Sequence, residues 1–545
     1  MPRSCRFLGR RLLRRALLFA SLLLLFACEA GHEPPRLLVV IVVDQLRADL
    51  LRRYDNCFTG GFRRLLDQGG GSTAAVHDHA ITDTAPGHAT LATGVHPSRH
   101  GIVDNAWCES RDGHVVVVPC VADSSTRILG AAAIGASPRH LQVPGLADWL
   151  RAAGEHARVV ALGGKDRSAI LLAGKGRGDV YWFSRAEGRF VTSTYYRDDY
   201  PEWLERFQHG PWLGFCRDST WTCTVPAGLR SRARGAAALP AADPHERSGG
   251  AAAARSSQEA ADLHSFTHAF AVATEDFWTW WLATPALDEA TLALAQEAVR
   301  SCALGKDATP DLLALGLSQT DRIGHRYGPL SLEQLDHLLR LDRALGEFFA
   351  SLDTVVGKGR WLVGLSADHG VTDTAADRRE DGVPVQVLDL ASVDSLFADL
   401  QALDGTGAAR EELAAARVVR CPYVAAAFTH TEVMFSAPGD SFLDLFRHSY
   451  YAGRFPMAPL GSSARRRTLG VYGVEARLQS WATWSEAGAD HGSPYLPDRQ
   501  VPMLFLGAGV RPGSWSGHLR TVDFAPTLLQ MLRLPVPAGL DGHPY

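Results

Sequence analysis

Carboxylates and imidazoles recur in this sequence at spacings that suit metal binding. Asp321 and His325 are four residues apart, and Asp368 is followed directly by His369 and Gly370. On a helix, a spacing of four residues places two side chains on one face, where both can bind the same ion. An acid beside an imidazole makes a compact ligand pair when glycine lets the backbone turn away. Both pairs therefore predict metal ligands, and from these residues alone a surface pair is the alternative for Asp321 and His325.

Two further ligands complete this pattern. Asp44 ends an apolar run, and His491 lies in the glycine-rich stretch 487–493. The ligands divide into two sets, each suited to one divalent ion: Asp44, Asp368 and His369, and Asp321, His325 and His491. Mixed Asp and His ligation is typical of catalytic zinc, whereas calcium and magnesium prefer oxygen alone. Two ions about 4 Å apart could clamp the attacking and leaving oxygens of a displacement at phosphorus.

Thr84 is the candidate nucleophile of such a displacement. It precedes Ala85 and Pro86, which is how a helix N-terminus is commonly written, with the hydroxyl at or near the cap position. Unpaired N–H groups at that end favour a phosphoryl group and an alkoxide. A threonine hydroxyl is a weak nucleophile at neutral pH and needs a metal to activate it. The alternative is a threonine that only caps the helix.

Lys165 and Arg167 are candidates for binding an anion. They occupy alternate positions in the turn that starts at Gly163 and Gly164, directly after a predicted strand. Two cations placed in this way could converge on one phosphoryl group. From these residues alone, a solvated basic loop is the alternative.

The elements that must position these residues are short apolar runs, which predict strands buried on both faces of a parallel sheet. Predicted strands cover 36–44, 157–162, 311–317, 360–367 and 501–506, with a hairpin over 179–195. Helices are predicted at 61–68, 330–352 and 523–534, and the aromatic stretch 266–282 is predicted as a helix that packs in the core. Open α/β sheets bind ligands at the carboxyl ends of their strands, where Asp44 and Asp368 fall. The predicted fold class is therefore α/β.

Composition supports an ordinary globular protein. Of the 545 residues, 46% are hydrophobic and 21% charged, with a formal net charge of −4, so nothing indicates a nucleic-acid partner. The length suits one large α/β core with insertions. Between about residues 226 and 262 the chain becomes rich in Ala, Arg, Gly and Ser, which predicts a flexible insertion without chemistry.

The first residues have the pattern of an export signal. Six arginines fall within 3–15 and are followed by the apolar run 16–27, which is short for a membrane span. We therefore predict a signal peptide over 1–27 and a linker over 28–35, before a catalytic domain over 36–545. Cys28 follows a stretch that resembles a bacterial lipobox, so lipidation there would attach the protein to a membrane. Cleavage near Ala30 and a retained anchor are alternatives, and all three place the domain outside the cytoplasm.

The cysteines beyond this signal form an odd set in a compartment that permits disulfides. Cys108 with Cys120, and Cys216 with Cys223, could each close a short loop. The sequence contains no CxxC motif, which argues against a cysteine-based zinc knuckle.

The order of these motifs resembles the alkaline phosphatase superfamily. The stretches Thr84–His88, Gly101–Asn105 and Lys165–Arg167 are similar to those of the PafA-like, phosphate-irrepressible alkaline phosphatases, which use a threonine nucleophile. The resemblance runs from about Arg36 to the C-terminus, and Tyr181–Phe183 and Ser193–Tyr196 add to it. It implies an alkaline-phosphatase-like core, with a mostly parallel sheet, helices on both faces and inserted cap segments.

The resemblance also implies a phosphate monoesterase with two Zn²⁺ ions and a covalent phosphothreonine intermediate. Asp44, Asp368 and His369 would bind the zinc that carries the Thr84 alkoxide. The second zinc, which meets the leaving group, would be held by Asp321, His325 and His491. Asn105, Lys165 and Arg167 would hold the phosphoryl oxygens. We expect small phosphate monoesters as substrates, a periplasmic or membrane-attached location and a monomeric state.

Four rival functions remain within reach of these motifs. A nucleotide pyrophosphatase/phosphodiesterase shares both metal sites but must accommodate a second substituent on phosphorus, so Lys165 and Arg167 favour the monoesterase. A sulfatase is disfavoured because His88 stands where that family's motif has arginine. Cofactor-independent phosphoglycerate mutases are disfavoured because they resemble cytoplasmic enzymes with a serine nucleophile, whereas this chain has a threonine and an export signal. The non-enzymatic alternative is a surface lipoprotein that binds phosphate esters. We interpret His88 and His100 as structural, whereas Asp104 adds negative charge beside Asn105.

Overall fold

The computed structural model describes residues 34–112, 114–210, 220–234, 266–270, 276–439, 441–457, 468–483 and 488–545. The predicted signal at 1–27, Cys28 and Cys216 lie outside these residues. Within the described ranges, no helix has both the length and the apolar character needed to cross a bilayer.

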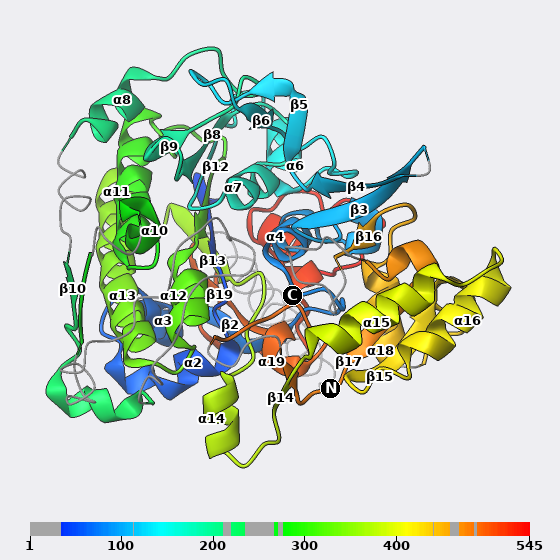
Figure 1. The fold of residues 1–545 in the computed structure, drawn as a ribbon. Coiled ribbons are helices and arrows are strands. Elements are labelled where there is room, and N and C mark those ends of the chain that lie inside the picture. The colour runs from blue at the N-terminus through cyan, green and yellow to red at the C-terminus, as the bar shows by residue number, and fades with distance from the viewer. Residues whose placement is uncertain are drawn as a thin grey trace, which may run out of the picture.

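A mixed, mostly parallel sheet runs through the centre of the molecule (Figure 1). Its strand order is β20-β2-β19-β13-β1-β12-β7-β8-β9. The strands are β1 (Leu37–Val43), β2 (Gly70–Val76), β7 (Val159–Gly163), β8 (Asp179–Ser184), β9 (Arg189–Val191), β12 (Asp311–Leu317), β13 (Trp361–Ser366), β19 (Gln500–Gly507) and β20 (Gly513–Ser514). This α/β architecture confirms the predicted fold class, and the predicted apolar strands all form.

Strand direction decides which loops reach the active edge of the sheet. β1, β12, β13, β7 and β8 are parallel, so their carboxyl ends lie along one edge. β19 is antiparallel to β13 and to β2, so its amino end reaches that same edge. The loop before β19, which carries His491, therefore meets the loops that follow β1, β12 and β13.

The two faces of the sheet contribute to separate hydrophobic cores. Along β1, Leu37, Val39, Ile41 and Val43 pack into one core, while Leu38, Val40 and Val42 pack into the other. This alternation follows from the two-residue period of a strand and requires both faces to be apolar. β1 is accordingly buried along its whole length.

Helices cover both faces (Figure 1). The helices that pack into the first core are α2 (Ala48–Arg53), α3 (Gly61–Gln68), α8 (Glu202–Gln208), α10 (Phe277–Trp281), α11 (Ala286–Ser301), α12 (Gln319–Tyr327) and α13 (Leu332–Leu352). Those of the second core are α4 (Thr84–Thr93), α6 (Leu146–Ala153), α7 (Asp166–Leu172) and α20 (Phe524–Met531). The short α5 (Pro97–His100) follows α4. The predicted helices at 61–68, 330–352 and 523–534 correspond to α3, α13 and α20.

The chain between β13 and β19 builds a smaller cap region. It contains α14 (Ala375–Glu380), α15 (Leu390–Gln401), α16 (Ala408–Val418), α17 (His430–Phe435), α18 (Ser441–Ser449), α19 (Leu496–Arg499) and the strands β14 (Gln386–Val387), β15 (Val424–Thr429), β16 (Phe455–Pro456), β17 (Val474–Leu478) and β18 (Ala482–Thr483). α15, α16, β15 and β17 share a third hydrophobic core. These are the inserted cap segments that the family resemblance implies.

Short strands complete the structure. β3 (Ala106–Arg111) and β4 (His114–Pro119) form a hairpin, and β16 adds to its edge. β5 (Ala122–Arg127) pairs with β6 (Ile134–Ala136), and β10 (Thr220–Thr222) pairs with β11 (Thr267–Ala269).

Three local predictions need correction. The aromatic stretch 266–282 is not one helix, because Thr267–Ala269 pairs as a strand and helix α10 covers only Phe277–Trp281. Its predicted role in core packing is right, since Trp281 is fully buried. The insertion predicted from residue 226 is ordered as far as Arg234, which pairs with Asp381 at 2.8 Å, while 235–265 lies outside the described residues.

The suggested disulfide between Cys108 and Cys120 does not form, because Cys120 is a buried thiol. Burial raises the pKa of this thiol well above its usual range, so it stays protonated. The second suggested pair includes Cys216, which lies outside the described residues.

Candidate active site

The N-terminus of helix α4 presents Thr84 at the active edge of the sheet. Asp83 is the capping residue, with an extended backbone, and Thr84 is the first helical residue, one position later than the predicted cap. All ten residues of α4 are buried, so this helix end lies inside the molecule and Thr84 is only 1% exposed. The positive end of the helix dipole therefore acts on Thr84 with little screening by solvent.

Three carboxylates lie at the same edge of the sheet. Asp44 follows β1, Asp321 lies in the first turn of α12 after β12, and Asp368 follows β13. All three are buried, being at most 3% exposed. Their positions at the ends of neighbouring parallel strands explain why residues so distant in sequence converge.

Lys165 contacts two of these acids and the threonine. Its Nζ lies 2.7 Å from Asp44 Oδ2, 2.6 Å from Asp321 Oδ2 and 3.4 Å from Thr84 Oγ1. Burial raises the pKa of Asp44, and the nearby negative charges add to this effect. Burial also opposes ionisation of Asp321, but the charge of Lys165 outweighs it and lowers the pKa of that carboxyl. One ammonium thus serves a site with a surplus of negative charge.

Three imidazoles complete the cluster, and each is anchored through Nδ1 to a backbone carbonyl. The contacts are His369 to Gly370 O at 2.9 Å, His325 to Ala489 O at 2.8 Å and His491 to Thr82 O at 2.9 Å. This arrangement leaves each Nε2 facing a carboxylate: His325 and His491 face Asp321 Oδ1 at 3.1 and 3.6 Å, and His369 faces Asp44 Oδ1 at 3.4 Å. An imidazole held by its other nitrogen in this way is typical of a metal ligand.

The donor atoms fit divalent ions. Within each of two groups, Asp321 with His325 and His491, and Asp44 with Asp321 and His369, the ligand atoms lie within 4.8 Å of one another. Asp44 Oδ1 and His369 Nε2 are buried without a hydrogen-bond partner. A bound cation would satisfy both atoms, which cost free energy if left unpaired.

The grouping differs in one respect from the predicted ligand sets. Asp321 lies close enough to join both groups, while Asp368 Oδ2 lies 3.8 Å from His369 Nε2. The structure therefore brings all six predicted metal-binding side chains into one cluster around Thr84, with Asp321 at its centre. We call these seven residues the active-site cluster.

Known proteins are similar to this chain in sequence and in fold. A family model described as Type I phosphodiesterase / nucleotide pyrophosphatase matches residues 38–171 and 174–411. Alkaline phosphatase PhoK from a Sphingomonas species is 30% identical over 564 aligned residues, which cover 95% of this chain and 92% of PhoK. The chain belongs to the alkaline phosphatase superfamily.

Members of the superfamily named PafA match in sequence and in structure. Alkaline phosphatase PafA from Elizabethkingia meningoseptica is 28% identical over 94% of both chains. A crystal structure of wild-type PafA superposes with a TM-score of 0.80 and 26% identity, covering 94% of this chain and 99% of that one. A solved PafA variant, in which a threonine, an asparagine, a lysine and an arginine are replaced, matches with a TM-score of 0.78 and 25% identity.

Three residues that were not predicted to belong to the site position its metal-binding side chains: Gln45, His88 and Asp83. Gln45 donates its backbone N–H to Asp368 Oδ1 and its side-chain amide to Asp321 Oδ1, at 3.1 and 2.8 Å. Its φ of +65° turns the chain sharply at the end of β1. The only signal in the sequence was its place directly after Asp44.

His88 and Asp83 position two of the metal-binding side chains, Asp368 and His491. His88 Nδ1 lies 3.0 Å from Asp368 Oδ2, so its structural role includes positioning this carboxylate. Asp83 Oδ1 lies 3.1 Å from Nδ1 of His491, beside the carbonyl that also holds that ring. Asp83 precedes Thr84 directly, which was the signal available in the sequence.

The three residues predicted to bind phosphoryl oxygens lie around the N-termini of α4 and α7. Asn105 Oδ1 accepts the N–H of Ala85 at 3.0 Å, which leaves the amide NH₂ of Asn105 as a donor. Arg167 is the second residue of α7. Burial opposes the charge of Arg167, but the surrounding acids outweigh it and raise its pKa.

Asp104 does not place a free negative charge beside Asn105. One oxygen of its buried carboxyl accepts the N–H of Asn105 and the other accepts the N–H of Met457. Burial and the neighbouring Asp83 raise the pKa of Asp104 well above its usual range. The carboxyl therefore orients the backbone and retains its proton more readily than an exposed aspartate.

Proposed function

We propose that the chain is a phosphate monoester hydrolase, an alkaline phosphatase, that passes the phosphoryl group through Thr84 to water at a site built for two zinc ions. One observation carries this proposal. Thr84 Oγ1 lies at the buried N-terminus of α4, 3.4 Å from Lys165 Nζ, among six side chains of the types that bind zinc.

The reaction divides into two displacements at phosphorus. In the first, Thr84 Oγ forms a bond to phosphorus as the bond to the ester oxygen breaks, and the alcohol leaves with a proton. In the second, a water oxygen bonds to phosphorus and the Thr84 Oγ–P bond breaks, which releases inorganic phosphate. Thr84 would be the covalent carrier in both steps.

Asp44, Asp368 and His369 would hold one zinc ion, and Asp321, His325 and His491 the other. When bound, the two ions supply Lewis acidity that stabilises negative charge on the attacking and leaving oxygens. Lys165, Arg167 and the Asn105 amide would hold the equatorial phosphoryl oxygens, where charge must be met by fixed donors. Small phosphate monoesters, which are dianions, suit this set of cations.

The comparison with PafA supports these roles. The four residue types replaced in the solved PafA variant, threonine, asparagine, lysine and arginine, occur here in the same order as Thr84, Asn105, Lys165 and Arg167. All six zinc-binding side chains are present as well. Both points count against the non-enzymatic alternative, a surface lipoprotein that binds phosphate esters without catalysis.

A phosphodiesterase of the same superfamily is the second candidate. The matching family model carries that description, and venom phosphodiesterase 1 from Crotalus adamanteus is 34% identical over 88 residues, or 16% of this chain. A diester carries a second substituent on phosphorus. Lys165 favours the monoesterase, because its ammonium fills space beside Thr84 that such a substituent would need.

We further propose that the protein is exported. The arginine-rich start and the apolar run 16–27 form a signal, and Cys28 would be the site of lipid attachment in the periplasm or at the outer membrane. Labelling cells with a radioactive fatty acid tests this proposal. Loss of label in Cys28→Ala with unchanged export supports lipidation, whereas equal labelling of both proteins contradicts it.

Hydrolysis of an aryl phosphate monoester and of the matching diester, by zinc-loaded protein, tests the main proposal. We expect a strong monoester preference that collapses toward the diester in Lys165→Ala. Lys175→Ala is the matched control, because Lys175 is an exposed lysine on the surface. If the diester is the better substrate and Lys165→Ala changes nothing, the phosphodiesterase is the correct function.

A further inference from the structure

The loop that ends in Asn105 is held from outside by an arginine of the cap region. Arg454 Nη1 donates hydrogen bonds to the backbone carbonyl of Gly101 and to that of His140, the latter at 3.0 Å. Its guanidinium also lies over the ring of Trp107, 4.7 Å from the centroid. Arg454 therefore contacts the chain four residues before Asn105 and two residues after it.

A tight turn after α18 places this guanidinium. The N–H of Arg454 bonds the carbonyl of Tyr451 at 3.1 Å, and Gly453 between them has a φ of +82°, a conformation that favours glycine. The turn sets its two end residues alongside each other, so the guanidinium also lies 4.8 Å from the centroid of the Tyr451 ring. Two aromatic rings and two carbonyls thus hold the cation.

Geometry, rather than a charge partner, holds the Arg454 side chain. Burial lowers the pKa of Arg454 from its usual value, and the nearby Glu109 does not outweigh the lost hydration. A guanidinium suits this place, because its planar group stacks on rings while its N–H groups donate in the plane. The side chain is therefore built to fix positions in the backbone around it.

The residues after Arg454 hold the same loop at two further points. The N–H of Met457 donates to Asp104 Oδ2 at 2.8 Å, and β16 pairs with the start of β3. Asp104 directly precedes Asn105, and β3 begins directly after it. The cap region therefore fixes the chain on both sides of the phosphoryl-binding amide.

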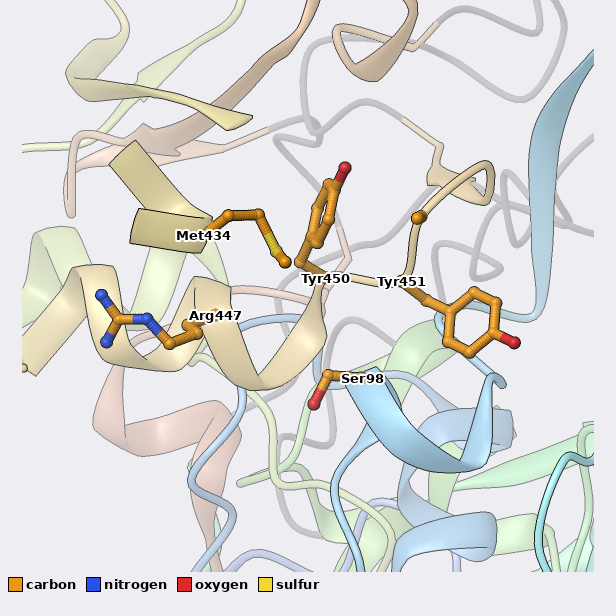
Figure 2. A pocket seen from close by; sticks show the side chains of 6 residues that line it. Ser98, Met434, Arg447, Tyr450 and Tyr451 are labelled. Carbon is orange, nitrogen blue, oxygen red and sulfur yellow. The ribbon is translucent and has the colours of Figure 1, made fainter. Parts of the chain in front are cut away.

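A pocket lies between the cap region and the core in this area. Its volume is about 510 Å³, and its lining includes Ser98 of α5 with Tyr450 and Tyr451 after α18 (Figure 2). Side chains do not fill the space between α5 and the turn that carries Arg454. The directed contacts of Arg454 consequently carry more of the attachment between the cap region and the Asn105 loop.

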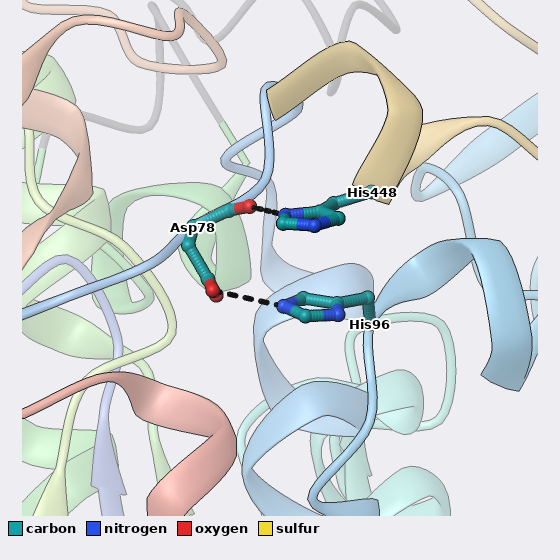
Figure 3. Close-up of side chains that lie close together, drawn as sticks. All are labelled: Asp78, His96 and His448. Carbon is teal, nitrogen blue, oxygen red and sulfur yellow. Dashed lines mark hydrogen bonds and ion pairs between the residues drawn. The ribbon is translucent and has the colours of Figure 1, made fainter. Parts of the chain in front are cut away.

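The loop that leads to Thr84 is attached to the cap region by different residues. His448 Nδ1 contacts the backbone carbonyl of Asp78 (Figure 3). Ser449 Oγ accepts the N–H of Ala80 at 2.7 Å. A change at position 454 should therefore act on the Asn105 loop and leave these contacts in place.

We propose that Arg454 is a positioning residue for phosphoryl transfer, which fixes the Asn105 amide from the side of the cap region. The proposal rests on the proposed function through the role of Asn105 as a donor to phosphoryl oxygen. Asn105 Oδ1 accepts the N–H of Ala85, so the amide is oriented locally, but the placement of its backbone depends on the loop. A displacement of about 1 Å can cost up to ~10²-fold in rate.

A double-mutant cycle on an aryl phosphate monoester tests this role. Asn105→Ala should lower kcat/KM by about 10²-fold, because one donor to phosphoryl oxygen is lost. Arg454→Ala should lower it by on the order of tenfold. In Asn105→Ala protein, the further change Arg454→Ala should cost less than about twofold, because the amide that it positions is already absent. Losses that multiply in the double variant would overturn the proposal, since Arg454 would then act independently of Asn105.

Two further variants separate this role from a general loss of packing. Arg64→Ala is the matched control, because the Arg64 guanidinium also lies over a tryptophan, 5.1 Å from the centroid of Trp361, but at the opposite end of β13 from the active edge. Its kcat/KM should stay within about twofold of the unaltered value, and a loss equal to that of Arg454→Ala would contradict the proposal. If Arg454→Ala does not fold, Arg454→Met takes its place in the cycle, since its stem still packs between the rings but donates no hydrogen bond.

Binding of inorganic phosphate to zinc-loaded protein gives a readout without turnover. Calorimetry should show weaker binding in Arg454→Ala than in the unaltered protein, and no further weakening when Arg454→Ala is added to Asn105→Ala. Unchanged phosphate affinity in Arg454→Ala would contradict the positioning role. The two proposals can fail separately: if the matching diester is the better substrate, the monoesterase is wrong, and the same cycle run on the diester still decides the role of Arg454.

Discussion

The active-site cluster and a second cluster, which consists of Asp78, His96 and His448, contain the same residue types, but they balance charge differently. Around Asp321, the single ammonium of Lys165 contacts two of the three buried carboxylates. Around His96, two carboxylates are matched by that imidazole and by two arginines, with Arg99 at 2.7 Å from Asp541 and Arg520 at 3.5 Å from Asp78. Only the first cluster therefore has a surplus of negative charge, and only it includes a candidate nucleophile, Thr84, at the N-terminus of a buried helix. A surplus of carboxylates favours bound cations, whereas catalysis also needs the nucleophile and the cationic side chains.

Replacing Thr84 should have the largest effect, because it should abolish catalysis and leave metal binding unchanged. In Thr84→Ala we expect kcat/KM for an aryl phosphate monoester to fall by roughly 10³-fold or more, because no covalent carrier remains. The zinc content should not change, since the six ligand side chains stay in place. Steady-state kinetics and metal analysis on the same sample check both parts. A fall of less than about tenfold would assign the attack on phosphorus to another group.

Replacing Asp83, the carboxylate that lies behind His491, should have an intermediate effect on activity. Asp83→Asn removes the negative charge beside Nδ1 of His491. Loss of a side chain that orients a metal ligand commonly lowers metal affinity or activity by about 10–100-fold. We expect the lost activity to return at raised zinc concentration. Asp311→Asn is the matched control, because this buried carboxyl accepts backbone N–H groups at the opposite end of β12 and contacts no metal ligand in the described residues. Equal losses in both variants would contradict the positioning role of Asp83.

The second cluster should make the zinc-free protein sensitive to alkaline pH. Burial alone would lower the pKa of His96, but the carboxylates of Asp541 and Asp78 outweigh it and raise the pKa from 6.5 to about 9. A raised pKa contributes stability that is complete below the unfolded value and is lost as pH rises through the folded value. Between these two pKa values, the free energy of unfolding should fall by on the order of 1–3 kcal/mol.

Urea unfolding of chelated protein at several pH values measures this fall. His448, Arg99 and Arg520 also face the cluster, so the relevant quantity is the difference between the unaltered protein and His96→Asn at each pH. That difference should shrink as pH rises. A difference that stays constant would show that His96 is not protonated in the folded state.

The smallest effect should come from the exposed edge of the second cluster. The side chain of Arg99 is 45% exposed, so its ion pair with Asp541 is screened by solvent. Arg99→Ala should lower the free energy of unfolding by less than about 1 kcal/mol. Arg520→Ala should cost more, because that arginine is less exposed and bonds both Asp523 and the Asp541 carbonyl. Thermal unfolding of the two variants side by side tests the order.

The sequence was sufficient for the central strands and the loops that follow them. Unbroken apolar runs such as 37–43 and 311–317 can only be buried on both faces, and the acids that end them must then share one edge. The spacing of Asp321 and His325 is local, so a helix at that point was enough to pair them. The direct neighbours Asp368 and His369 needed no tertiary information.

The second cluster left no comparable signal. Asp78, His96, His448 and Asp541 come from four remote segments, and none has a second ligand at helical spacing. Their convergence depends on where the cap helix α18 packs, which hydrophobic periodicity does not specify. The aromatic stretch 266–282 was misread for a similar reason, since its short strand exists only through pairing with β10.

The position of β19 has a consequence for the timing of folding. In the sheet that the structure describes, β2 borders only β20 and β19, so the strand that leads to Thr84 joins the main sheet through residues 500–507. Thr84 is synthesised early, but the strand that precedes it, β2, is joined to the sheet by one of the last strands to leave the ribosome. A nascent or truncated chain without this strand therefore carries every catalytic residue up to His491 and still lacks the site. We therefore expect no activity from a chain that ends before β19.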